Sequence, residues 1–121
     1  MVVEIDESIF FKRKYNRGQR REHSWVFGTV EREGGATAVF TVPNRSAEQL
    51  LPLINRWLLP GSIIVSDMWK AYNGIGNMGN FCTHFTLNHS VEDARMDEYR
   101  GEPFHVHTNT IEGEWNLLKK Q

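Results

Sequence analysis

The chain has 121 residues, which is enough for one domain and little more. It is 40% hydrophobic and 24% charged, as is typical of a globular protein with a single core. A formal net charge of -1 indicates no particular partner, and neither a membrane-spanning stretch nor a signal peptide is visible. The single cysteine, Cys82, excludes a disulfide within the chain and favours an intracellular protein.

The first part of the chain is rich in β-branched and aromatic residues with alternating polarity. This pattern predicts a strand over Val2–Phe11 and a hairpin of Ser24–Arg32 with Ala36–Val42, separated by Glu33-Gly34-Gly35. Three consecutive strands of this kind predict an antiparallel meander.

A helix is predicted next, because Ser46 and Gln49 have the spacing of a capping box and Pro60-Gly61 ends the apolar stripe. We expect Trp57, on that stripe, to be a core residue. The apolar run Ser62–Ser66, bounded by turn signals, predicts a buried strand that ends just before Asp67.

The remainder of the chain is more polar. Its predicted elements are a helical turn at Trp69–Tyr72, a loop at Gly74–Asn80, a strand at Phe81–Leu87, a loop or insertion at Val91–Pro103, and a helix from Thr108 or Asn109 to Gln121 with Trp115 in its core stripe. A meander, a crossover helix and a further strand predict an α/β fold with a mixed sheet and flanking helices, the layout of the ribonuclease-H-like fold.

Two aspartates are placed where such a sheet would bring them together. Asp6 lies inside the first strand and Asp67 follows the buried strand. If these strands are neighbours, the two carboxylates meet at a strand end, where ligands gather in open α/β sheets. A divalent cation such as Mg or Mn would relieve their repulsion. Without a metal, Asp6 would be a solvent-facing strand residue and Asp67 a helix cap.

The last helix offers a third oxygen ligand. Asn109, Glu112, Asn116 and Lys119 are three, four and three residues apart and share one helix face. Either Asn109 or Glu112 could complete a two-metal site for phosphodiester cleavage, and Lys119 could contact a DNA phosphate. The same Asn109 and Glu112 also fit a capping box without any catalytic role.

Positive charge is concentrated just after the first strand. The run from 12 to 21 contains Lys12, Arg13, Lys14, Tyr15, Arg17, Arg20 and Arg21, and we expect it to contact the DNA backbone rather than simply to protect a sheet edge. His84, His89, His105 and His107 do not have the spacing of a zinc site, and His107 is expected to orient the acidic site or the DNA.

These motifs resemble, in order and over nearly the whole chain, the ISXO-type (Merlin-like) insertion-sequence transposase domain of the DDE superfamily. The resemblance is carried by Val3–Ser8, Lys12–Gly18, Trp25–Gly28, Arg45–Glu48, Leu59–Gly61, Ile64–Tyr72, Asn88–Ser90, His107–Glu112, Trp115 and Lys119.

The resemblance implies a metal-dependent transposase that acts on transposon ends and target DNA, with Asp6 and Asp67 as the first two catalytic acids. The third is Asn109, with Lys119 downstream, in the insertion-sequence version of the motif, or Glu112 in other relatives. It also implies a homo-oligomer on two DNA ends. We expect residues 1–121 to be a single transposase catalytic domain and a fragment, without the N-terminal DNA-recognition region of such proteins and with its C-terminus as a second candidate for truncation. The alternatives are a defective or domesticated DNA-binding or assembly module, and a nuclease of the same fold acting on another nucleic acid.

Overall fold

The computed structural model describes residues 1–13, 21–57, 60–77 and 83–120, and of residues 11–13 and 21–23 it describes the backbone alone. Five strands form one sheet in the order β3-β2-β1-β4-β5. Their bounds are β1 Val2–Arg13, β2 Arg21–Glu31, β3 Thr37–Val42, β4 Ile63–Asp67 and β5 Thr83–Leu87. The first three pair antiparallel, whereas β4 runs parallel to β1 and to β5. The predicted meander and the mixed α/β sheet of ribonuclease-H-like layout are confirmed.

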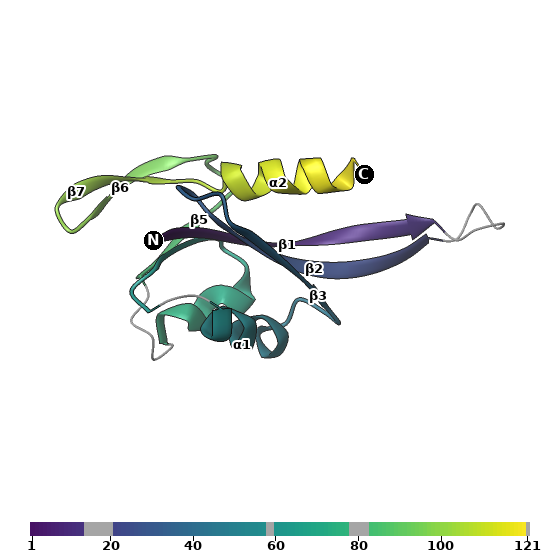
Figure 1. The fold of residues 1–121 in the computed structure, drawn as a ribbon. Coiled ribbons are helices and arrows are strands. Elements are labelled where there is room, and N and C mark those ends of the chain that lie inside the picture. The colour runs from purple at the N-terminus through teal and green to yellow at the C-terminus, as the bar shows by residue number, and fades with distance from the viewer. Residues whose placement is uncertain (14–20, 58–59, 78–82, 121) are drawn as a thin grey trace.

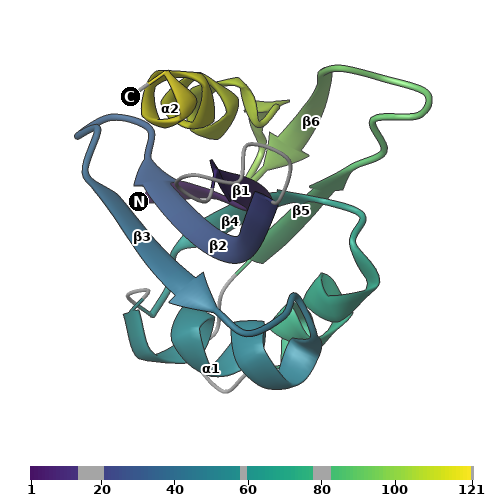
Figure 2. The ribbon, with the colours of Figure 1, turned by 90° about the vertical axis from the view of Figure 1, so that its right-hand side faces the viewer.

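Helices lie on both faces of this sheet (Figure 2). Helix α1 (Ala47–Trp57) and the 3₁₀ helix η1 (Lys70–Asn77) lie on one face, and α2 (Asn109–Lys119) lies on the other. A separate hairpin of β6 (Arg95–Tyr99) and β7 (Glu102–Val106) leads into α2. None of the described helices is long and apolar enough to cross a membrane.

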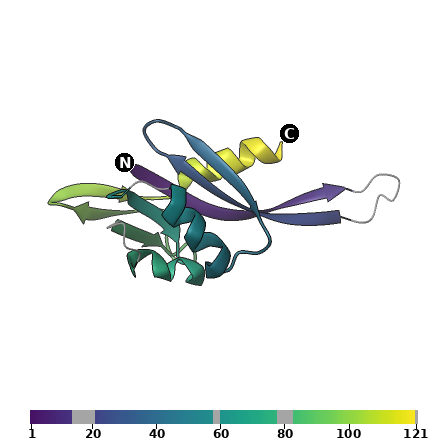
Figure 3. The ribbon, with the colours of Figure 1, turned by 60° about the horizontal axis from the view of Figure 1, so that its bottom comes forward.

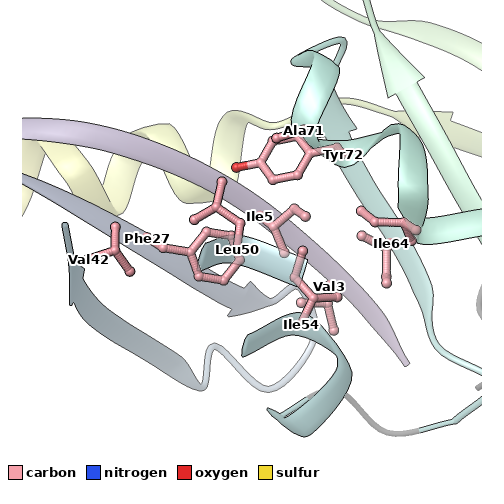
Figure 4. Close-up of a cluster of buried hydrophobic side chains, with 10 residues drawn as sticks. Val3, Ile5, Phe27, Val42, Leu50, Ile54, Ile64, Ala71 and Tyr72 are labelled. Carbon is pink, nitrogen blue, oxygen red and sulfur yellow. The ribbon is translucent and has the colours of Figure 1, made fainter. Parts of the chain in front are cut away.

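The side chains of β1 serve the two faces alternately, as the two-residue period of a strand requires. Val3 and Ile5 are buried in a cluster with Leu50 and Ile54 of α1 (Figure 4). The intervening Glu4 and the next even residue, Asp6, instead bond to α2. One strand therefore holds the hydrophobic core with one face and polar groups with the other.

The hairpin of β1 and β2 extends well past the rest of the sheet (Figures 1 and 3). Its ladder runs from Val3↔Glu31 to Arg13↔Arg21, but β4 pairs with β1 only as far as Glu4↔Val65. The outer part of the hairpin, beyond the Ile9↔Trp25 pair, is thus a two-stranded ribbon, since β3 joins β2 at Trp25.

The segment Val91–Pro103 is not the predicted loop. It contains β6 and the start of β7, because an apolar group on this hairpin finds a partner on the sheet. Phe104 stacks on Phe85 of β5 with ring centroids 4.8 Å apart, and Tyr99 packs edge-on against both rings. Three of the charged residues that suggested a loop, Asp97, Glu98 and Glu102, occupy exposed positions of the hairpin.

Two smaller expectations also fail. The predicted loop Gly74–Asn80 begins inside η1, which continues to Asn77, and residues 78–80 lie outside the described part. Trp57 is not a core residue, since 55% of it is exposed. It is the last residue of α1 and packs on one side, against Phe40 of the edge strand β3. Trp115, by contrast, is buried as predicted.

Candidate metal centre

Three carboxylates meet where β4 ends beside β1. Ligand oxygens of Asp6, Glu7 and Asp67 lie within 4.8 Å of one another. The parallel pairing Val3↔Ile64 and Glu4↔Val65 brings Asp67 level with Asp6, because both strands run the same way from that register. The convergence of Asp6 and Asp67 follows from the predicted neighbourhood of the two strands, whereas Glu7 was not anticipated.

Asp6 is held by helix α2. The indole Nε1 of Trp115 donates a hydrogen bond of 3.0 Å to Asp6 Oδ2. Burial, reinforced by the charges of Glu7 and Asp67, raises the pKa of Asp6 to about 7, although the Trp115 bond opposes this shift. A carboxyl with such a pKa is poised to exchange its proton for a cation near neutral pH.

Glu7 lies on the opposite side of the cluster, with 5% of its side chain exposed. The Tyr72 hydroxyl donates to Oε1 at 2.9 Å, and Arg45 Nη1 donates to Oε2 at 3.2 Å. Burial and the charge of Asp67 raise the pKa of Glu7. Burial and the neighbouring Glu7 likewise raise the pKa of Tyr72, so its hydroxyl stays protonated and donates.

Asp67 is fixed by the turn that follows β4. Its Oδ1 accepts the backbone N–H of Trp69 at 3.0 Å. The preceding Ser66, fully buried, donates to the Asp67 carbonyl at 2.8 Å and lies 2.7 Å from Nε2 of His84. Burial lowers the pKa of His84, which favours a neutral ring at this contact.

A second acidic group lies deeper, and sequence reasoning missed it. Glu4 is fully buried, and its Oε2 accepts from Arg32 Nε at 2.7 Å. Arg32 also donates to the carbonyls of His105 and His107, both at 2.7 Å, so it joins β2 to the segment before α2. The other oxygen of Glu4 accepts the backbone N–H of Ile111 at 3.0 Å. A charged residue amid the apolar alternation Val3–Ile5 was the available signal.

The N-terminal turn of α2 carries the predicted third ligands. Asn109 is exposed, and its backbone N–H donates to Nδ1 of His107 at 3.1 Å. Glu112 has half of its side chain exposed, accepts from the Thr108 hydroxyl at 3.3 Å and lies 3.8 Å from His89. Among the described residues, Glu112 is not part of the carboxylate group formed by Asp6, Glu7 and Asp67.

Helix α2 begins with Thr108 as its N-cap residue, which differs from the capping box of Asn109 and Glu112. The N-cap side chain makes no capping bond; the Glu4 carboxylate satisfies the Ile111 amide instead. At the other end of the helix, Lys119 Nζ lies 5.4 Å from the ring centroid of Phe10, at the base of the ribbon.

The structure describes only part of the run predicted to contact DNA. Lys14, Tyr15, Arg17 and Arg20 fall outside the described residues, and Lys12, Arg13 and Arg21 are described by their backbone alone, in the last two pairs of the ladder.

Of the histidines, His105 and His107 have ring centroids 4.6 Å apart, and His107 Nδ1 lies 3.7 Å from Glu4 rather than beside Asp6. Burial and the charge of Arg32 lower the pKa of His107.

Known proteins resemble this chain in both fold and sequence. A chain of the cryo-EM structure of the simian T-cell lymphotropic virus intasome in complex with PP2A regulatory subunit B56 gamma matches over 98% of the present chain and 38% of its own, with a TM-score of 0.61 and 15% identity. The catalytic core domain of BIV integrase matches over 98% and 66%, with a TM-score of 0.56 and 17% identity. These likenesses establish the fold.

Sequence similarity is more specific. An uncharacterized transposase-like protein of Haemophilus influenzae is 32% identical over 79 residues, which are 65% of this chain and 56% of that protein. The chain therefore spans little more than half the length of this relative. The model of the ISXO2-like transposase domain matches residues 2–121. Because that match covers almost every residue, the chain belongs to the ISXO2-like transposase domain family, a group of DDE transposase domains.

Proposed function

We propose that this chain is the catalytic core of a transposase, which cleaves DNA phosphodiester bonds and joins the ends to a target. The observation that carries the proposal is the meeting of Asp6 and Asp67, from two neighbouring parallel strands, with oxygens within 4.8 Å of each other and of Glu7. Membership of a transposase domain family supports the assignment of this acidic group to DNA cleavage and joining.

The donor set suits a hard divalent cation. Carboxylate oxygens are the ligands that Mg²⁺ and Mn²⁺ prefer, and three of them lie close enough to share one ion or two. Burial, followed by the charges of Glu7 and Asp67, raises the pKa of Asp6 to about 7, so a bound cation would relieve the repulsion among the carboxylates. Metal held here would activate the attacking oxygen and stabilise the leaving one in phosphodiester chemistry.

The third ligand is proposed to come from α2, as Asn109 or Glu112, with Glu7 as the competitor already beside Asp6 and Asp67. Glu7 has both oxygens engaged by Tyr72 and Arg45, which favours a positioning role for it. Isothermal titration with Mn²⁺ separates the three. The ligand is the residue whose change to alanine weakens Mn²⁺ binding about as much as Asp67→Ala.

The proposed partner is DNA. We propose that the basic residues Lys12, Arg13, Lys14, Arg17, Arg20 and Arg21, together with Tyr15 of the same run, bind the phosphate backbone, and that Lys119, at the base of the ribbon, does so too. The ribbon leads directly out of the strand that carries Asp6, so DNA bound along it would run to the carboxylates.

The test compares the protein with Asp6→Asn and Asp67→Asn variants on supercoiled plasmid and labelled duplex DNA, with Mg²⁺ or Mn²⁺. Both variants should lose nicking by at least about a hundredfold, since each removes a charged metal ligand, while DNA binding persists. Asp93→Asn, an exposed carboxylate, is the control and should cleave normally.

Cleavage that survives Asp67→Asn would refute the proposal. A protein that binds DNA and Mn²⁺ but never nicks would instead support a domesticated or defective module that binds DNA. Preferential cleavage of RNA–DNA hybrids would support a nuclease of the same fold.

A further inference from the structure

An arginine beside the carboxylates is held in an unusual way. Arg45 lies between β3 and α1, and its guanidinium carbon is 3.9 Å from the ring centroid of Trp69 and 4.9 Å from that of Trp25. Two aromatic rings therefore contact one planar cation. Such contacts restrict the orientation of the side chain.

Arg45 and Trp69 are both hydrogen-bonded to the carboxylate cluster. Trp69 donates its backbone N–H to Asp67 Oδ1 at 3.0 Å and its indole N–H to the Arg45 carbonyl at 2.8 Å. Arg45 itself donates to Glu7 at 3.2 Å. The position of the guanidinium is thus set by two of the three clustered carboxylates.

Arg45 has hydrogen-bonding capacity left over. A guanidinium has five N–H donors, and within the described part of the chain Glu7 is the acceptor that its side chain binds. Some 42% of the side chain is exposed, whereas Glu7 beneath it is 5% exposed. A partly exposed guanidinium with donors not used within the described residues can bind a further anionic group.

We propose that Arg45 is a substrate-positioning residue that binds a DNA phosphate next to the carboxylate cluster, and that Trp25, Trp69 and Glu7 hold its guanidinium in place. This inference rests on the proposed function for the identity of the substrate. The planar fork of arginine matches two phosphate oxygens, and stacking fixes its direction before the DNA arrives. A prepositioned cation also offsets the repulsion between the DNA and three carboxylates.

The first test is DNA binding without metal. A fluorescein-labelled duplex is titrated in EDTA over a series of salt concentrations against the unaltered protein, Arg45→Ala, Arg45→Lys and the control Arg56→Ala. Arg56 is an exposed arginine on α1 that contacts the ring of Trp57, so Arg56→Ala removes the same charge and a similar aromatic contact as Arg45→Ala.

Arg45→Ala should weaken binding about tenfold and reduce the slope of log K against log salt by about 0.9, the value for one phosphate contact. Arg45→Lys should keep the slope but lose several-fold in affinity, because lysine retains the charge without the fork. Affinity and slope for Arg45→Ala equal to those of Arg56→Ala would overturn the proposal.

A second variant distinguishes an Arg45 that only stabilises the fold from one that binds phosphate. Trp69→Phe keeps a ring under Arg45 but removes the indole bond to its carbonyl. If this variant is as stable as the unaltered protein yet binds DNA more weakly with an unchanged slope, the orientation of Arg45 matters; equal binding would count against the proposal. Should Arg45→Ala fail to fold, Arg45→Lys and Trp69→Phe decide the question.

The binding measurements contain no metal and involve no cleavage, so they stand apart from the proposed reaction. Loss of binding in Arg45→Ala together with an unaltered protein that never nicks DNA would retain the phosphate contact and refute the nuclease chemistry. Nicking that is lost in Asp67→Asn but kept in Asp93→Asn, together with DNA binding by Arg45→Ala equal to that of Arg56→Ala, would retain the proposed reaction and refute the phosphate contact of Arg45.

Discussion

The Glu4 carboxylate accepts the backbone N–H of Ile111 at 3.0 Å, across 107 positions of sequence. This bond fastens the start of α2 to β1, and four residues further along the helix Trp115 bonds to Asp6, two residues further along the strand. Helix and strand are therefore aligned by two polar contacts. The first contact is buried and lies outside the cluster of Asp6, Glu7 and Asp67, whereas the second involves Asp6 of that cluster.

Glu4→Gln should lower the free energy of unfolding by about 3 kcal/mol. It leaves Arg32 opposite a neutral amide in a site where Glu4 has no exposed surface and Arg32 has 15%. Urea denaturation measures the change. Glu92→Gln is the control, because Glu92 and Arg95 form a pair with about a third of each side chain exposed and should contribute less than about 1 kcal/mol. Equal losses in the two variants would contradict the prediction.

Gly28→Ala should destabilise the chain by about 1–3 kcal/mol, as overpacking does. A Cβ at this position would lie 2.5 Å from Trp115, so the indole would have to move and release Asp6. The matched change Gly113→Ala, within α2 and with nothing near its Cβ, should instead stabilise by about 0.5–1 kcal/mol through helix propensity. Thermal denaturation of both variants checks the prediction, which a stable Gly28→Ala would refute.

Stability of the metal-free protein should depend on pH through Asp6. Its pKa rises from 3.8 to about 7, so between these values the folded chain holds a proton that the unfolded chain has released. The free energy of unfolding contributed by Asp6 is therefore greatest below pH 3.8 and falls as the pH rises to about 7, by about 1.4 kcal/mol per pH unit. The raised pKa of Glu7 acts in the same direction.

Urea denaturation of the protein and of Asp6→Asn at about pH 5 and pH 7 isolates this effect, because asparagine does not titrate. The stability difference between them should change with pH, whereas Asp93→Asn should run parallel to the unaltered protein. Parallel curves for Asp6→Asn would mean that Asp6 titrates normally.

Trp115→Phe should raise the pKa of Asp6 above about 7, because the hydrogen bond from Trp115 is an influence that lowers it. Phenylalanine retains a ring to pack against Phe10. Carbon-13 NMR of the Asp6 carboxyl follows the titration, and Mn²⁺ binding at neutral pH should weaken because a larger fraction is protonated. Trp57→Phe, on the exposed end of α1, is the control. An unchanged Asp6 titration in Trp115→Phe would show that the indole bond is not formed in solution.

The fold was predictable wherever the pattern of apolar residues was unambiguous. Alternation in β1 and the short apolar run of β4 predicted both strands, and their pairing then predicted that Asp6 and Asp67 meet. The β6–β7 hairpin was not predictable, because it is covered on one side by a few aromatic contacts such as Phe85 with Phe104 and is otherwise polar.

The polar groups around the centre were less predictable, for a physical reason. Glu4, Asp6 and Glu7 are equivalent carboxylates in the sequence, and their roles depend on which side chain meets each one after folding. Glu4 meets Arg32, Asp6 meets Trp115, and Glu7 meets Tyr72. All three partners lie far away in the chain, so the spacing of neighbouring residues could not predict these contacts.

The alternation of apolar and acidic residues along β1 also ties the placement of the carboxylates to the formation of the core. A slip of one residue against β2 would turn Val3 and Ile5 away from α1 and put Glu4 and Asp6 into the apolar cluster in their place. Such a chain would lose its core at the same moment as its acidic group. Folded copies with misplaced carboxylates should therefore be rare, because one register places both the apolar cluster and the acidic group.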